Sequence, residues 1–232
     1  MTNVFEDWNG FEKFLLFANM GIALMFLVLG GDYSFIPILS VLASLGNTMS
    51  VILVAKKKIS NYAWAILGAI TYAIVAFAYT NTGEWMLNLF YYFPMNIIGW
   101  IMWKKNSSDG ESVESKALSF KQAVCVYGFT AIAVFAYASF IYNPSLQVFL
   151  YGYVTEYGFS KFLIDSTSTV LSITAMILLV KCYREQWILW IVVDMVSIVL
   201  WCITFDPTMI LMWSVLLANA VYGYIQWKKE VE

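Results

Sequence analysis

The segment WILWIVVDMVSIVLWCITF, residues Trp187–Phe205, is apolar and long enough to cross a lipid bilayer as one α-helix, because about 20 apolar residues span the hydrocarbon core. One carboxylate, Asp194, interrupts this segment near its middle. A carboxylate is costly at that depth, so by default it marks a ligand or ion pathway or a proton relay. The segment therefore predicts both a membrane helix and a candidate functional residue on it.

Tryptophans flank Asp194 on one face of this predicted helix. At 100° per residue, three of them share with Asp194 an arc of about 60°. They are Trp187, Trp190 and Trp201. An acid lined by indoles suits an aromatic or cationic small molecule. The alternative is a buried structural acid that pairs with a neighbouring hydroxyl or amide.

The composition places the whole chain in a membrane. Of its 232 residues, 61% are hydrophobic and only 12% are charged, whereas a soluble domain carries about a quarter charged residues. A net charge of −2 gives no reason to expect a nucleic-acid partner. The chain has no histidine, and Cys125, Cys182 and Cys202 lack metal-ligand spacing, so we expect no metal, no cofactor and no disulfide framework.

Hydrophobic runs predict an all-α integral membrane protein with eight transmembrane helices. The predicted spans are residues 14–31, 35–55, 62–80, 85–103, 121–141, 162–180, 187–205 and 208–227. With eight spans, every lysine and arginine except Lys161 falls on one side of the membrane. Because basic residues concentrate in cytoplasmic loops, we expect both termini to face the cytoplasm.

An internal repeat organises these spans. Spans four and eight end on one pattern, Gly99, Trp103, Lys104 and Lys105 in the first and Gly223, Trp227, Lys228 and Lys229 in the second. Upstream, Lys58 and Trp64 align with Arg184 and Trp190. Spans two to four thus resemble spans six to eight, in a 1 + 3 + 1 + 3 order of parallel repeats like that of sugar-transporting SWEET proteins. The alternative is chance similarity between hydrophobic helices.

The repeat divides the chain into four parts. They are an N-terminal extra helix at 1–34, the first three-helix repeat at 35–105, a cytoplasmic loop with linker helix and outer loop at 106–160, and the second repeat at 161–232. Span three carries Trp64, Gly68 and Tyr72 on one face, and Gly68 aligns with Asp194. We expect this face to meet the Asp194 face near the bilayer midplane, where such transporters bind substrate.

Amide side chains extend the candidate site. Asn88 and Asn96 lie broadly on one side of span four, where Pro94 should kink the helix, and Asn47 is a similar case in span two. Amides bind carboxamides and hydroxyls, although they also serve as interhelical hydrogen bonds. The candidate binding residues are Asp194, Trp187, Trp190, Trp64, Asn88, Asn96, Tyr72, Tyr91, Trp201 and Asn47.

Three motifs resemble the nicotinamide riboside transporter family, PnuC. They are Asn61-Tyr62-x-Trp64, Asn88-x-Phe90-Tyr91-x-x-Pro94-x-Asn96-x-x-Gly99-Trp100-x-x-Trp103, and Trp187-x-x-Trp190-x-x-x-Asp194. The resemblance covers the chain from about residue 35 to its end. One departure is Asn96, where the family pattern has glutamine, so the amide is retained on a shorter side chain.

The resemblance implies a SWEET-like homotrimer in the bacterial inner membrane that passes nicotinamide riboside by facilitated diffusion, with cytoplasmic phosphorylation trapping the product. The cationic pyridinium of that substrate suits indole faces and a carboxylate. Thiamine is also a cationic aromatic, so a carrier of thiamine or another vitamin is the alternative on the same fold. A membrane enzyme is disfavoured by the absence of histidine, of paired carboxylates within one span and of a phosphate-binding glycine loop.

Overall fold

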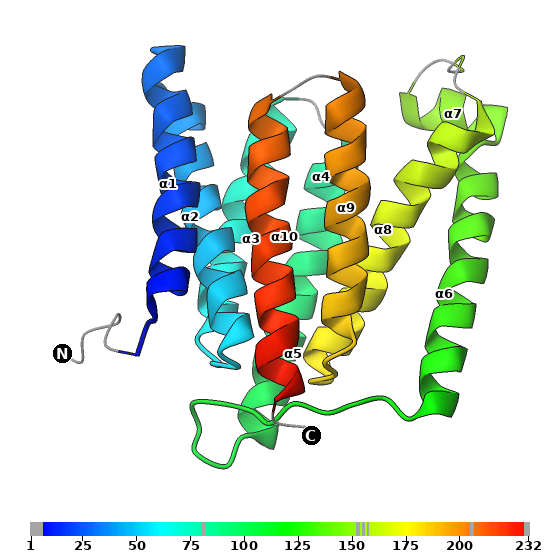
Figure 1. Cartoon of the computed structure of the whole chain (residues 1–232). Helices are drawn as coiled ribbons and strands as arrows, with labels where there is room; N and C mark the ends of the chain where they lie inside the picture. Colours follow the sequence, from blue (N-terminus) through cyan, green and yellow to red (C-terminus); the bar gives the residue numbers. More distant parts are fainter. Residues whose placement is uncertain are drawn as a thin grey trace.

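The computed structural model describes residues 7–79, 82–151, 154, 156, 158–204 and 207–229, and in this part of the chain the regular elements are all helices. Figure 1 shows them as a row of upright helices with a long loop beneath. They are α1 (Gly10–Gly30), α2 (Phe35–Ala55), α3 (Asn61–Ala78), α4 (Thr82–Leu87), the π-helical turn η1 (Asn88–Tyr92), α5 (Phe93–Asn106), α6 (Phe120–Ile141), α7 (Pro144–Tyr151), α8 (Phe159–Val180), α9 (Gln186–Thr204) and α10 (Pro207–Lys228).

Five described helices, α1, α2, α3, α6 and α8, are long and apolar enough to cross a membrane. The described side chains of α9 add a shorter apolar stretch, Gln186–Val199. These helices confirm an all-helical, multi-pass membrane protein. Helices suit the bilayer because every backbone hydrogen bond is made within the segment.

The predicted fourth span is a compound helix of α4, η1 and α5. Pro94 lies in the first turn of α5, where its missing N–H and its ring disrupt the regular hydrogen-bond ladder. The π-helical turn Asn88–Tyr92 directly precedes that helix. The regular α-helix of this span is therefore interrupted directly before the proline, by a π-helical turn.

Six of these helical segments pack in a closed ring. Its order is α2, α3, α5 with η1, α8, α9 and α10, which packs back against α2. In this order α3 and α9 occupy opposite positions. Outside the ring, α1 packs against α2 and α10, and α6 packs against α8 and α7 at the other edge of the row (Figure 1).

The same turn joins α2 to α3 and α8 to α9. Lys57 and Cys182 have positive φ, 57° and 62°. Lys57 N–H donates to the Val54 carbonyl and Cys182 N–H to the Leu179 carbonyl, both at 2.9 Å. In each turn the next residue also bonds back to the helix, which completes a Schellman motif.

The register of these turns differs from the sequence alignment by one residue. If Lys57 is aligned with Cys182, then Tyr62 aligns with Trp187 and Ala69 aligns with Asp194. The alignment of Trp64 with Trp190, and of Gly68 with Asp194, is therefore wrong for the backbone. That alignment matched identical tryptophans. The backbone alignment instead matches the turn residues that have positive φ.

The ring consists of two groups of three helices, α2, α3 and α5 in the first and α8, α9 and α10 in the second. Two tryptophans form reciprocal hydrogen bonds between these groups. Trp103 Nε1–H donates to the Leu179 carbonyl at 3.1 Å, and Trp227 Nε1–H donates to the Val54 carbonyl at 3.0 Å. Both indoles are fully buried. Each therefore satisfies its polar N–H with a carbonyl near the end of a helix of the opposite group.

Aromatic side chains form one cluster at the end of the helix bundle where Trp103 and Trp227 lie. Trp103 and Trp227 have ring centroids 6.1 Å apart, and each meets a further ring edge-on, Tyr62 at 5.1 Å and Trp187 at 6.0 Å. All four side chains are buried. We call Tyr62, Trp103, Trp187 and Trp227 the aromatic plug.

The loop at 107–119 ties the two matching turns together. Val113 N–H donates to the Lys57 carbonyl at 3.2 Å, and Lys116 N–H donates to the Cys182 carbonyl at 2.8 Å. Ser115 Oγ donates to the Trp227 carbonyl at 3.0 Å. The loop is thus a bonded strap across the end of the bundle (Figure 1).

Glycines let the plug close. A Cβ at Gly223 would come 2.4 Å from the Trp187 ring, and one at Gly99 would come 2.5 Å from the Tyr62 ring. We expect Gly223→Ala to lower the free energy of unfolding by about 1–3 kcal/mol, because an added methyl in a packed core forces its neighbours apart. Denaturant titration of the purified protein in mixed micelles measures the change.

The matched control is Gly128→Ala on α6, where an added Cβ would meet nothing within 4 Å. This variant should be as stable as wild type or slightly more stable, because alanine favours helix over glycine by up to about 1 kcal/mol. Equal stabilities for the two variants would contradict the packing described for the plug.

Candidate functional site

Asp194 lies on α9 with only 4% of its surface exposed. Within the described part of the chain, its carboxylate makes no hydrogen bond and no ion pair. A structural acid of this burial would be expected to have such a partner, because an unpaired buried charge is expensive. The described structure therefore lacks the hydroxyl or amide partner on which the structural interpretation depends.

The tryptophans predicted beside Asp194 divide into different environments. Trp187 is buried in the aromatic plug against Gly223. Trp190 is only partly buried, and packs against the cluster of Ala175, Leu178 and Leu189 as well as against the plug cluster. The side chain of Trp201 lies outside the described residues. Of Trp187 and Trp190, only Trp190 thus keeps exposed surface.

On α3, the predicted face carries two roles. Trp64 is partly buried and packs against the cluster that Trp8 forms with residues of α1 and α2, and Val215 of α10 packs against the same cluster. Tyr72 is half-buried. Gly68 lies at the crossing with α2, since a Cβ there would come 2.3 Å from Asn47 Oδ1. The small size of Gly68 is therefore required by helix packing, and Asn47 lies at the same crossing.

The polar residues of the fourth span also separate. Asn88 Nδ2–H donates to the Glu84 carbonyl at 2.9 Å, and Tyr91 Oη–H donates to the Ile173 carbonyl of α8 at 2.7 Å. Asn96 is 6% exposed, and its side chain has no hydrogen-bond partner among the described residues. Asn96 is thus a buried amide with its hydrogen-bonding capacity unused.

The ring order places the helices that carry the candidate residues around one axis. Asp194 and Trp190 come from α9, Trp64 and Tyr72 from α3 opposite, and Asn96 from α5 between α3 and α8. This arrangement brings an acid, an amide and aromatic rings to the inner helices of the bundle. Such a set can bind an aromatic cation that carries hydrogen-bonding groups.

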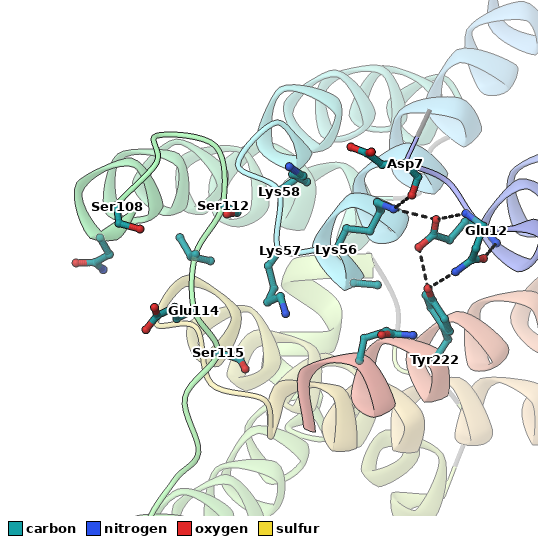
Figure 2. Close-up of a pocket in the computed structure, with 15 residues that line it drawn as sticks. Asp7, Glu12, Lys56, Lys57, Lys58, Ser108, Ser112, Glu114, Ser115 and Tyr222 are labelled. Atoms are coloured by element: carbon teal, nitrogen blue, oxygen red, sulfur yellow. Dashed lines mark hydrogen bonds and ion pairs between the residues drawn. The ribbon is translucent and has the colours of Figure 1, made fainter. Parts of the chain in front are cut away.

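A second polar site escaped the sequence analysis. A cavity of about 980 Å³ lies where α1 begins, bordered by the turn at Lys56–Lys58, the loop at 106–115, and Tyr222 of α10. Figure 2 shows Lys56, Glu12 and Tyr222 pointing toward one another at its wall. The spacing Asn9-x-x-Glu12 is a capping-box signal that could have indicated it.

Glu12 is the centre of this second site. Its carboxylate is 2% exposed, accepts a hydrogen bond from Tyr222 Oη at 2.8 Å, and pairs with Lys56 Nζ at 3.1 Å. Asn9 Nδ2–H donates to Tyr222 Oη at 2.7 Å. The network joins α1, α2 and α10, and so holds the outer helix to the ring.

Loop groups outside the spans are held in defined charge states. Hydrogen bonds from the backbone and hydroxyl of Ser112 hold the pKa of Asp109 well below its usual range. Burial raises the pKa of the Cys182 thiol to about 11. Asp109 is therefore a stable anion that organises the strap, and Cys182 is a neutral thiol in the turn.

We expect Lys56→Met to lower the free energy of unfolding by about 3–5 kcal/mol, because it leaves the buried Glu12 carboxylate without its cation. Lys58→Met is the control, since Lys58 pairs with the exposed Glu111 at 3.6 Å and such surface pairs contribute at most about 1 kcal/mol. Denaturant titration compares both with wild type. Similar losses in the two variants would refute the central role given to Glu12.

Sequence comparisons identify relatives of this chain. The family model described as nicotinamide mononucleotide transporter matches residues 37–229. The nicotinamide riboside transporter PnuC of Neisseria mucosa is 31% identical over 240 residues, which cover 99% of this chain and 85% of that protein. The PnuC of Haemophilus influenzae is 36% identical over 197 residues, 84% of this chain and 80% of that protein.

A solved structure shares the fold. The crystal structure of the vitamin B3 transporter PnuC matches with a TM-score of 0.75 and 31% identity, over 97% of this chain and 93% of that one. The family model covers most of the chain, and the motifs singled out in spans three, four and seven lie within it. The chain therefore belongs to the nicotinamide mononucleotide transporter family.

Proposed function

We propose that this protein carries nicotinamide riboside across the bacterial inner membrane by facilitated diffusion, as a carrier and not as an enzyme. The observation that supports this best is the buried carboxylate of Asp194, which has no partner among the described residues. A bound cation would supply that partner. The relatives described above are named as nicotinamide riboside transporters, and that substrate is a cation.

The substrate site comprises Asp194, Trp190, Trp64, Tyr72 and Asn96. The carboxylate attracts the pyridinium charge or accepts from ribose hydroxyls. Trp190 offers an indole face to the cationic ring, a contact of roughly 0.5–2 kcal/mol. Asn96 hydrogen-bonds the carboxamide, which its unused side chain favours.

The other predicted site residues border this set. Trp187, as a member of the aromatic plug, closes the site at one end, while Asn88 and Tyr91 hold the η1 turn in shape through their hydrogen bonds. Asn47 lines the crossing of α2 and α3. By helical periodicity Trp201 shares a face with Asp194. Its side chain lies outside the described residues.

The architecture we propose is eight spans in the order 1 + 3 + 1 + 3, with an extra helix at 1–34, repeats at 35–105 and 161–232, and connecting elements at 106–160. Matching left-handed turns and the reciprocal tryptophan bonds support the repeat. The lysine distribution supports cytoplasmic termini, and the family resemblance supports a homotrimer.

The aromatic plug lies at the end of the bundle that carries the lysine-rich turn. With cytoplasmic termini, the plug closes the cytoplasmic exit. Release of substrate then requires the Trp103 and Trp227 rings to separate, and the reciprocal hydrogen bonds make this opening a concerted movement of both three-helix groups. Alternating access by movement of one repeat against the other would provide such a step.

We expect proteoliposomes containing the purified protein to take up nicotinamide riboside until its concentrations inside and outside are equal. An enclosed kinase that phosphorylates the substrate should allow further accumulation, because it removes free substrate from the lumen. Radiolabelled uptake measures both. Accumulation driven by a sodium or proton gradient alone would contradict facilitated diffusion, and uptake of thiamine without nicotinamide riboside would reassign the substrate.

We expect Trp190→Ala to weaken binding by on the order of 1–2 kcal/mol, because a stacking face is lost. Asp194→Asn keeps the side-chain shape but removes the charge, so affinity for the cationic substrate should fall more than affinity for a neutral analogue. Isothermal titration calorimetry measures both. Trp85→Ala is the control and should bind as wild type does, because Trp85 packs against Phe77 and Phe90, whose side chains are largely exposed.

A further inference from the structure

An apolar groove of about 760 Å³ separates α6 from α8, outside the ring that holds the proposed transport site. Phe129 and Val126 of α6 form one wall, and Ile173 and Ile177 of α8 form the other. A hydrogen bond of 3.3 Å from Thr130 Oγ1 to Thr174 Oγ1 joins the two helices at its floor. The groove lies between two helices that are both long and apolar enough to span a membrane.

The groove widens toward the beginning of α6. At the far end of this helix Ala138 and Ile141 are buried, whereas Phe129 is 75% exposed and Phe120 is 84% exposed. Figure 1 shows α6 and α8 spreading apart in this direction. From Gln122 to Tyr137 the groove-lining part of α6 extends roughly 22 Å at 1.5 Å per residue, enough to cover one leaflet of a hydrocarbon core about 30 Å thick.

The wide end of the groove carries hydrogen-bond donors. Lys181, Gln122 and Tyr183 all line it. Within the described residues, the Lys181 ammonium has no carboxylate partner, and neither does that of Lys121, which directly precedes Gln122. The groove therefore joins an apolar slot at membrane depth to a cationic, donor-rich end at the membrane surface.

We propose that this groove binds an anionic phospholipid, with one acyl chain between α6 and α8 and the headgroup phosphate at Lys181, Gln122 and Tyr183. Basic pockets between transmembrane helices on the cytoplasmic side suit such headgroups. A second copy of this chain is a poorer occupant, because it would bring the same unpaired lysines to the same end. The lipid fills the space between α6 and the ring, and so fixes the outer helix in place.

Native mass spectrometry of the full-length protein, titrated in detergent micelles with phosphatidylglycerol or phosphatidylcholine, tests the headgroup site. Wild type should retain phosphatidylglycerol preferentially. Lys181→Gln should weaken phosphatidylglycerol binding about fivefold, the equivalent of about 1 kcal/mol per basic residue at the surface, and should weaken phosphatidylcholine binding less, because the choline cation offsets the charge of its phosphate. Lys105→Gln, at the exposed end of α5, is the matched charge control and should behave as wild type. Equal phosphatidylglycerol binding by wild type and Lys181→Gln overturns the proposal.

A second pair of variants tests the acyl-chain slot. Ala133→Trp places a large side chain in the groove and should reduce retention of both lipids. Ala131→Trp, on an exposed face of the same helix, should reduce neither. Retention of both lipids by Ala133→Trp at wild-type level places the acyl chain elsewhere and overturns the proposal.

Cysteine chemistry distinguishes lipid from a second copy of the chain. Cys125 lines the groove and is exposed. With lipid in the groove, mild oxidation of native membranes should leave the protein monomeric on a denaturing gel. A disulfide-linked dimer that is lost in Cys125→Ser would place a second copy there and overturn the lipid assignment.

Discussion

The reciprocal hydrogen bonds of Trp103 and Trp227 hold the two groups of three helices together, and the rest of the fold is consistent with this one constraint. Each buried indole donates to a carbonyl near the end of a helix in the opposite group. Gly99 and Gly223 provide the space that lets Tyr62 and Trp187 close around the pair. The strap at 107–119 bonds to both turns beside them, so that this end of the bundle is a single packed unit.

Two of the buried carboxylates among the described residues, Glu12 and Asp194, differ in a way that separates structure from function. Glu12 has an ion pair, a tyrosine hydrogen bond and a capping interaction, all of which stabilise it as a link between α1 and the ring. Asp194 is almost as buried and has no comparable partner in the described structure. Burial without compensation is unfavourable in the empty protein, and a cationic ligand would relieve it. The same reasoning makes Asn96, with its unused amide, a better binding residue than Asn88.

The outer helices have a different relation to the ring. α1 is held by the polar network around Glu12, whereas among the described residues α6 packs mainly against α8, with an apolar groove between the two helices. A membrane lipid in that groove would fill the space between α6 and α8 and so complete the packing of α6. The proposed transport site and the proposed lipid groove thus lie on opposite sides of α8, and both would depend on the position of that helix.

The sequence by itself determined the membrane class and the helical character of the chain, and it singled out Asp194 as a candidate binding residue. Bilayer physics acts on composition and on single charges, so long apolar runs and one costly carboxylate are visible without coordinates. The motifs in spans three, four and seven also sufficed to indicate the family. Only the tertiary structure decided the register of the two helix groups, the burial of Trp187 in the plug, and the engagement of Asn88 and Tyr91 in structural hydrogen bonds. It alone revealed the Glu12 network, whose members lie far apart in the chain. These features depend on which backbone carbonyls and side chains meet across helices, and a helical face read from periodicity does not specify what lies opposite it.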